Sequence, residues 1–199
     1  MGSFTMRVKH AIGVNPTQRQ YLRSQHLAPI ASSGLKNDGR LPIEQHAAWQ
    51  EFQQIQMRKL EMILDEGQGE CLFAVPENRQ VLADNLHYFE RVRSELLAYV
   101  IMPNHAHILC RPLANYSLES LSRAWKRHSS DQLNRRLGRS GSLWQAESFD
   151  RIIRDADHYG RAVKYIAKNP SKARLKSQEA TLWFNAQILQ ANPPAPPAS

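Results

Sequence analysis

Two apolar runs separated by a two-residue break form the clearest pattern along the chain. They give candidate strands at Leu96–Met102 and Ala106–Arg111, with Pro103 and Asn104 between them. Short apolar runs bounded by turn-forming residues are typical of buried strands, and a proline followed by an asparagine favours a tight turn. The pattern therefore predicts two strands that fold back on each other through this turn.

A helical pattern follows at Ser117–Leu137. Ser117 is a favourable N-cap, Gly138 favours a helix end directly after Leu137, and the apolar positions recur at helical spacing. These positions are Leu118, Leu121 and Trp125. We expect them to face the core, with the basic residues of the segment pointing outward.

A second helix is predicted from Asp155 to Asn169. Asp155 is a favourable N-cap, and Pro170 is expected to stop the helix. The apolar stripe that should face the core consists of Tyr159, Ala162, Val163 and Ile166. Tyr165 lies off this stripe, on a polar face that it shares with His158, Arg161 and Asn169. We therefore expect the hydroxyl of Tyr165 to point outward.

The other expected elements rest on weaker patterns. Strands are expected at Ser148–Ile153, near Glu70–Phe73 and, as the poorest match, at Phe4–Val8; helices are expected at Pro42–Asp65 and Glu77–Val92. The proline- and alanine-rich tail should be disordered. We divide the chain into an atypical N-terminal segment at residues 1–40, a main domain at 41–190 and the tail at 191–199.

His105 and His107 stand at the start of the second predicted strand. Alternate side chains of a strand point to the same face of a sheet, so both imidazoles can bind one metal ion while Ala106 points the other way. Two histidines at this spacing also occur in strands that bind no metal. By itself, the pair leaves both interpretations open.

The chain is strongly basic. Its formal net charge is +8 and its isoelectric point is about 9.8, which favours a partner with a phosphate backbone. The candidate nucleic-acid-binding residues are Arg123, Lys126, Arg127, Arg135, Arg136, Arg139, Trp144 and Arg161. A basic helix face that is simply solvated is the alternative for the charged residues. For Trp144, stacking on an unpaired base and packing in the core both stay open.

Several function classes find no support in the sequence. Gly67-Gln68-Gly69 lacks the lysine and hydroxyl residue of a phosphate-binding loop. The two cysteines have no metal-site spacing, and no apolar run is long enough to span a membrane. We therefore expect a reduced intracellular protein, cytoplasmic and associated with the nucleoid, with no membrane partner.

Three motifs together carry a family resemblance. They are Met102-Pro103-Asn104-His105-Ala106-His107-Ile108-Leu109, then Leu143-Trp144-Gln145 with Phe149, and then Tyr165-Ile166-Ala167-Lys168-Asn169-Pro170. In this order and spacing they resemble the single-tyrosine HUH transposases of insertion sequences, and among those the REP-associated tyrosine transposases. The resemblance covers roughly residues 64–174.

The resemblance implies the α+β HUH endonuclease fold, a ferredoxin-like antiparallel sheet with helices packed on one face. It implies a metal-dependent endonuclease and strand-transferase that cleaves single-stranded DNA near hairpins, such as REP-like palindromes, through a 5′-phosphotyrosine. Tyr165 matches the nucleophile, and the matching metal ligands are His105, His107 and Asn169. The implied ion is Mg²⁺ or Mn²⁺, and the implied assembly is a monomer or a homodimer.

One feature departs from the family. Relatives open with an aromatic-rich strand in the centre of the sheet, and Phe4–Val8 matches it poorly. Without this strand, backbone groups of its neighbours would be unpaired, so a catalytically inactive DNA-binding derivative of the fold is an alternative. A histidine-triad hydrolase is a further alternative, but that class needs a third histidine where this chain has Leu109.

Overall fold

The computed structural model describes residues 5–11, 70–113, 115–145, 149–153, 155–186 and 188, with backbone alone for residues 5–11 and 149–151. The helix expected at Pro42–Asp65 and the tail that is expected to be disordered lie outside these residues. The domain boundaries expected at residues 40 and 190 lie outside them too. These expectations stay predictions.

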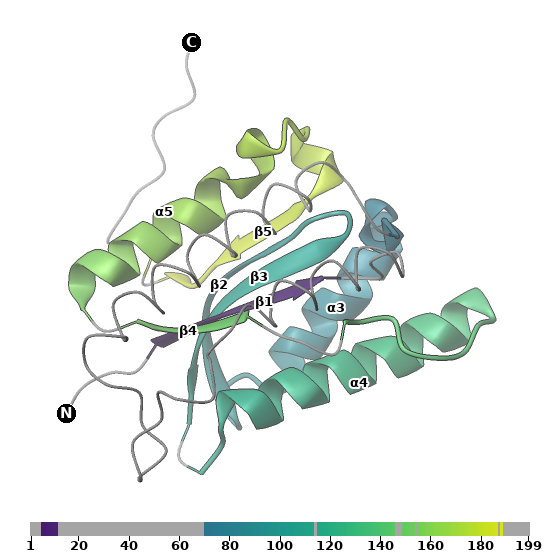
Figure 1. Cartoon of the computed structure of the whole chain (residues 1–199), viewed down its shortest axis with the longest axis horizontal. Helices are drawn as coiled ribbons and strands as arrows, with labels where there is room; N and C mark the ends of the chain where they lie inside the picture. The colour runs from purple at the N-terminus through teal and green to yellow at the C-terminus, as the bar shows by residue number, and fades with distance from the viewer. Residues whose placement is uncertain are drawn as a thin grey trace, which may run out of the picture. The chain divides into compact units, whose positions relative to one another are not determined.

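An antiparallel sheet of five strands, in the order β4-β1-β3-β2-β5, forms the centre of the described structure (Figure 1). The strands are β1 (Thr5–Ala11), β2 (Ser94–Ile101), β3 (His105–Pro112), β4 (Phe149–Ile153) and β5 (Thr181–Phe184). The helices are α3 (Pro76–Tyr88), α4 (Leu118–Leu137) and α5 (Ala156–Lys172), with short 3-10 helices η1 (Leu72–Ala74) and η2 (Ser177–Glu179). The predicted α+β class with an antiparallel sheet is confirmed.

The first strand is present. β1 pairs with β3 on one side and with β4 on the other, from Met6 opposite Cys110 to Ala11 opposite His105. The weak strand pattern at the N-terminus therefore supplies an interior strand of the sheet, between β4 and β3. Because its neighbours have their backbone partners, the sheet does not have the gap that motivated the inactive alternative.

The two predicted central strands form a hairpin. β2 and β3 pair antiparallel, and the N–H of Met102 donates to the carbonyl of His105 at 2.8 Å across Pro103 and Asn104. Ser94 to Ile101 and His105 to Pro112 differ from the predicted strands by one or two residues at each end. The predicted turn at Pro103 and Asn104 is confirmed.

Helices cover both faces of this sheet. α3 and α4 pack with Ile101, Ile108 and other residues in one apolar cluster, while α5 packs with Val100 and Leu109 in a second cluster. The expectation that all helices lie on one face is therefore wrong. The reason lies in β2 and β3, which are apolar at consecutive positions, so both of their faces must be covered.

The helices on the first face largely follow the sequence pattern. In α4, the hydroxyl of Ser117 accepts from the N–H of Ser120, Gly138 ends the helix, and the three predicted core residues are buried. α3 ends at Tyr88 rather than at Val92, because the chain turns back toward β2 through Arg91, whose φ is 61°. Phe89, the residue directly after the helix, is buried.

Two short elements were not predicted correctly. The strand expected near Glu70–Phe73 is the 3-10 helix η1, whose Phe73 N–H donates to the carbonyl of Pro103 at 2.9 Å. β5 was not predicted, because its four half-exposed residues carry too little pattern. It is a strand because it pairs with β2 at the edge of the sheet.

A pair of glycine substitutions tests the helix assignments. Gly138 has a φ of 62°, and Gly138→Ala should lower the free energy of unfolding by about 1 kcal/mol because a Cβ disfavours this conformation. Gly160 lies inside α5 with open space around it, and Gly160→Ala should raise the free energy of unfolding by about 0.5–1 kcal/mol. Urea unfolding measures both changes. If both substitutions shift the free energy of unfolding in the same direction, one of the two helix assignments is wrong.

Candidate active site

The tyrosine-bearing helix α5 has the predicted start and a later end. The carboxylate of Asp155 accepts from the N–H of His158 at 2.6 Å, as a capping aspartate should. The helix continues through Pro170 to Lys172, so the prediction that Pro170 stops it is wrong. A proline this close to the C-terminus removes only the hydrogen bond of its own nitrogen, and the last turn still forms.

The buried side of α5 is wider than the predicted stripe. Ala162, Val163 and Ile166 are buried as expected, but Asn169 is buried too, at 1% exposure. Asn169 follows Ile166 by three positions, so it continues the inward stripe, and its assignment to a polar outward face is wrong. Tyr165 is half-buried and packs against the same apolar cluster, so its expected outward direction is also wrong.

His105 and His107 lie on the same face of β3, as the alternation predicts, and that face is covered by α5. Both side chains are fully buried. Their ring centroids are 4.9 Å apart, and the ring planes are nearly perpendicular, at 89°. Two buried imidazoles in contact form a compact pair of nitrogen donors rather than a solvated surface pair.

The structure brings Tyr165 to this pair. Its hydroxyl lies 3.5 Å from Nε2 of His107, and the two rings meet edge to face with centroids 5.1 Å apart. The two residues are 58 positions apart in sequence, so the contact is made by the fold and within one chain. Nζ of Lys172 lies 5.3 Å from the centroid of the tyrosine ring and adds a positive charge that the sequence analysis did not single out.

Two other tyrosines have raised pKa values. Burial raises the pKa of Tyr99 to about 12, and its hydroxyl lies 3.3 Å from Nε2 of His87 within the cluster that also holds α3 and α4. Burial also raises the pKa of Tyr159, one of the predicted core positions of α5. Both phenols are therefore harder to ionise than an exposed tyrosine.

The donor set suits a divalent cation. The carboxamide oxygen Oδ1 of Asn169 is buried and has no hydrogen-bond partner among the described residues, one turn after Tyr165. Buried amide oxygens are nearly always satisfied, so this atom fits a cation ligand. Within the described ranges, no three or more histidine, cysteine or acidic side chains are arranged so that they could hold a metal ion together. The fitting donors are therefore two imidazoles and one amide, with room in the coordination shell for oxygens of a substrate.

The basic residues gather mainly on α4, on the other face of the sheet. Arg123 and Arg127 are exposed and pair with Glu119 and Asp131 one turn away, at 2.7 and 4.0 Å. Nζ of Lys126 donates to the carbonyl of Gln145 at 2.8 Å. The remaining predicted residues Arg135, Arg136 and Arg139 are exposed at the end of α4 and after it, and Arg161 is exposed on α5. The structure therefore does not bring the basic helix and the histidine pair together.

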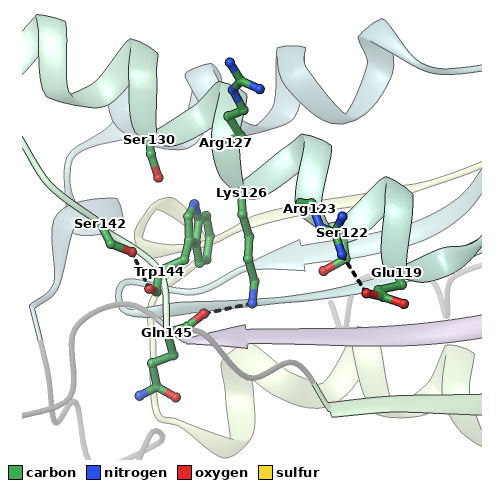
Figure 2. A pocket seen from close by; sticks show the side chains of 9 residues that line it. All are labelled: Glu119, Ser122, Arg123, Lys126, Arg127, Ser130, Ser142, Trp144 and Gln145. Carbon is green, nitrogen blue, oxygen red and sulfur yellow. Dashed lines mark hydrogen bonds and ion pairs between the residues drawn. The ribbon is translucent and has the colours of Figure 1, made fainter.

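A hollow of about 370 Å³ lies along α4 beside the segment that follows it (Figure 2). Its walls are formed by Glu119, Ser122, Arg123, Lys126, Arg127, Ser130, Ser142, Trp144 and Gln145. Three of these side chains are cationic and one is acidic, so the hollow carries a net positive charge.

Trp144 belongs to the core. Its side chain is 4% exposed, its Nε1 donates to the hydroxyl of Ser129 at 2.8 Å, and its ring lies 5.4 Å from that of Phe73. A base can stack on this indole only if the indole leaves these contacts. Of the two interpretations that the sequence left open, the structure supports packing.

Comparison with known proteins agrees with the motifs. Residues 78–169, a little under half of the chain, match the family model described as "Transposase IS200 like". This result confirms the resemblance to the tyrosine transposases. No curated protein matches the chain.

A solved structure of a REP-associated tyrosine transposase bound to a REP hairpin is similar to this chain at 16% sequence identity. The similarity covers 86% of this chain and 69% of that one, with a TM-score of 0.48. Among the described residues, no helix is long and apolar enough to cross a membrane.

Proposed function

We propose that this protein is a metal-dependent endonuclease and strand-transferase for single-stranded DNA, with Tyr165 as its nucleophile. The observation that carries the proposal is the 3.5 Å contact between the hydroxyl of Tyr165 and Nε2 of His107, beside the ring of His105. The transposase family match supports the reaction class. A covalent adduct between the protein and a single-stranded hairpin oligonucleotide is the direct test.

The proposed reaction is a phosphoryl transfer that conserves bond energy. The phenol of Tyr165 loses its proton, and its oxygen attacks the phosphorus of one phosphodiester. The bond between phosphorus and the 3′ oxygen breaks, the 3′ oxygen takes up a proton, and a 5′-phosphotyrosine remains. Attack by a DNA 3′-hydroxyl reverses the step and joins a new strand. A phenol serves both directions, because it is a better leaving group than an alkoxide.

Three side chains would hold the metal ion: His105, His107 and Asn169, the last through its buried Oδ1. Mg²⁺ or Mn²⁺ bound there would offset the charge that builds on the phosphate oxygens. The apolar cluster under α5 limits the access of water to the phenol, and Lys172 places a further positive charge beside its ring.

The DNA substrate is proposed to carry a hairpin, as the motif resemblance implies, and to bind the cationic face of α4. Because α4 and the histidine pair lie on opposite faces of the sheet, the DNA must pass around a sheet edge to reach Tyr165. A single-stranded segment is flexible enough for this path, whereas a duplex is stiff over such lengths. The geometry therefore favours a hairpin held at a distance from the cleaved strand.

The salt dependence of binding tests the role of α4. In the variant Arg123→Gln/Arg127→Gln, the slope of log K against log salt should become shallower by about 0.7 for each lost contact to a single-strand phosphate. Arg91→Gln removes a charge from an exposed turn residue outside α4 and should leave the slope unchanged. Fluorescence anisotropy with a labelled hairpin oligonucleotide measures both. Equal slopes in all three proteins would show that α4 does not bind the backbone.

An inactive DNA-binding derivative is the second function that the sequence left open. It was motivated by a missing first strand, and β1 has its place between β3 and β4. No observation on the described residues now favours it. A gel shift without any covalent adduct, in the presence of Mg²⁺ or Mn²⁺, would support it over the proposed reaction.

A further inference from the structure

Asn104 contacts the first histidine of the pair. It is buried in the turn between β2 and β3, and its Oδ1 lies 2.7 Å from Nδ1 of His105. A carboxamide oxygen can only accept a hydrogen bond, so Nδ1 carries the proton in this contact. In a neutral imidazole with a protonated Nδ1, the lone pair is on Nε2.

The backbone that carries Asn104 is fixed from two directions. Across the turn, the N–H of Met102 donates to the carbonyl of His105, and from η1 the N–H of Phe73 donates to the carbonyl of Pro103 at 2.9 Å. The position of Phe73 is itself held, because the buried guanidinium of Arg79 donates to its carbonyl at 2.7 Å. A side chain on so constrained a turn can set the direction of its neighbour's ring.

We propose that Asn104 is a positioning residue that fixes the tautomer and the ring orientation of His105, so that Nε2 is the atom presented to the metal ion. The proposal rests on the metal site of the proposed function. Hydrogen-bond partners of this kind orient the histidine ligands of metal sites, and their removal typically weakens metal binding by about 10–100-fold.

The effect should be specific to one histidine. Oδ1 of Asn104 lies beside Nδ1 of His105, whereas Nε2 of His107 lies 3.5 Å from the hydroxyl of Tyr165. A residue that only stabilises the turn would change the stability of the hairpin without changing the tautomer of one ring. The tautomer of His105, compared with that of His107, therefore separates the two roles.

Two substitutions at Asn104 form a matched pair. Asn104→Asp keeps an acceptor oxygen facing Nδ1, and Asn104→Leu replaces the amide by an apolar side chain of similar size. NMR correlation of the imidazole nitrogens in the metal-free protein reports the tautomer, with signals assigned through a His105→Gln variant. We expect a protonated Nδ1 on His105 in the wild type and in N104D, and a tautomer mixture in N104L, with His107 unchanged.

Binding of Mn²⁺ provides the second measurement, made by electron paramagnetic resonance of the free ion at a temperature where all variants are folded. N104L should bind Mn²⁺ about 10–100-fold more weakly than the wild type, and N104D should bind about as well as the wild type. Unchanged tautomer and affinity in N104L, with or without lower stability, would overturn the proposal. If the wild type itself binds no Mn²⁺, the metal site of the proposed function fails, and the NMR result still decides the role of Asn104.

Discussion

Tyr165→Phe should abolish the covalent protein–DNA adduct, and this is the largest effect that we expect of any substitution. The substitution removes one oxygen atom, and without it no phosphotyrosine can form, so adduct formation should fall by at least about 1,000-fold. The ring contacts with His107 and with Lys172 do not need the hydroxyl, and the fold should be retained. Denaturing gel electrophoresis after incubation with a labelled single-stranded hairpin measures the adduct.

Tyr159→Phe is the matched control, because it removes the same atom from the same helix. Tyr159 belongs to the apolar cluster under α5, and we expect this variant to form the adduct close to the wild-type level. Thermal unfolding and DNA binding of both variants should resemble those of the wild type. If the adduct persists in Tyr165→Phe, or disappears in Tyr159→Phe alone, the assignment of the nucleophile is wrong.

His105→Ala and His107→Ala should each lower adduct formation by about 100-fold or more, and chelation with EDTA should have a comparable effect on the wild type. The physical reason is the charge on the attacked phosphate, which an imidazole-held cation would offset. Added Mn²⁺ should raise the Tm of the wild type, because a ligand that binds the folded state stabilises it. It should not raise the Tm of the double variant His105→Ala/His107→Ala.

His128→Ala controls for the loss of an imidazole elsewhere. His128 is exposed on α4, with its ring 5.8 Å from that of Phe89, and its removal should leave both the adduct and the Mn²⁺ effect unchanged. Adduct formation by the double variant in EDTA would rule out the metal site. If the wild type needs a metal ion to form the adduct and the double variant responds to the metal in the same way, residues other than His105 and His107 bind the metal.

The sequence predicted those elements whose causes are local. The apolar runs and Pro103-Asn104 gave the hairpin, because burial and turn geometry are decided by neighbours in the chain. The capping residues Ser117 and Asp155 marked the starts of α4 and α5 correctly. Alternation along β3 placed His105 and His107 on one face without any tertiary information.

Errors arose where a local rule was weaker than the surrounding packing. Pro170 was expected to stop α5, but its cost in the last turn is small beside the packing of the helix on the sheet. Asn169 was assigned to a polar face because it is polar, and it is buried because the stripe continues to it. β5 carries almost no pattern and is a strand through its pairing with β2.

What the sequence determined by itself is the identity of the candidate site residues and the local structure that carries them: an imidazole pair on a strand, a phenol on a capped helix, and a basic helix. Tertiary structure decided their mutual placement. It brought Tyr165 to His107 across 58 positions, put α4 on the opposite face, and buried Trp144. The reason is that backbone periodicity depends on nearby residues, whereas the face that a helix covers depends on apolar area buried across the whole sheet.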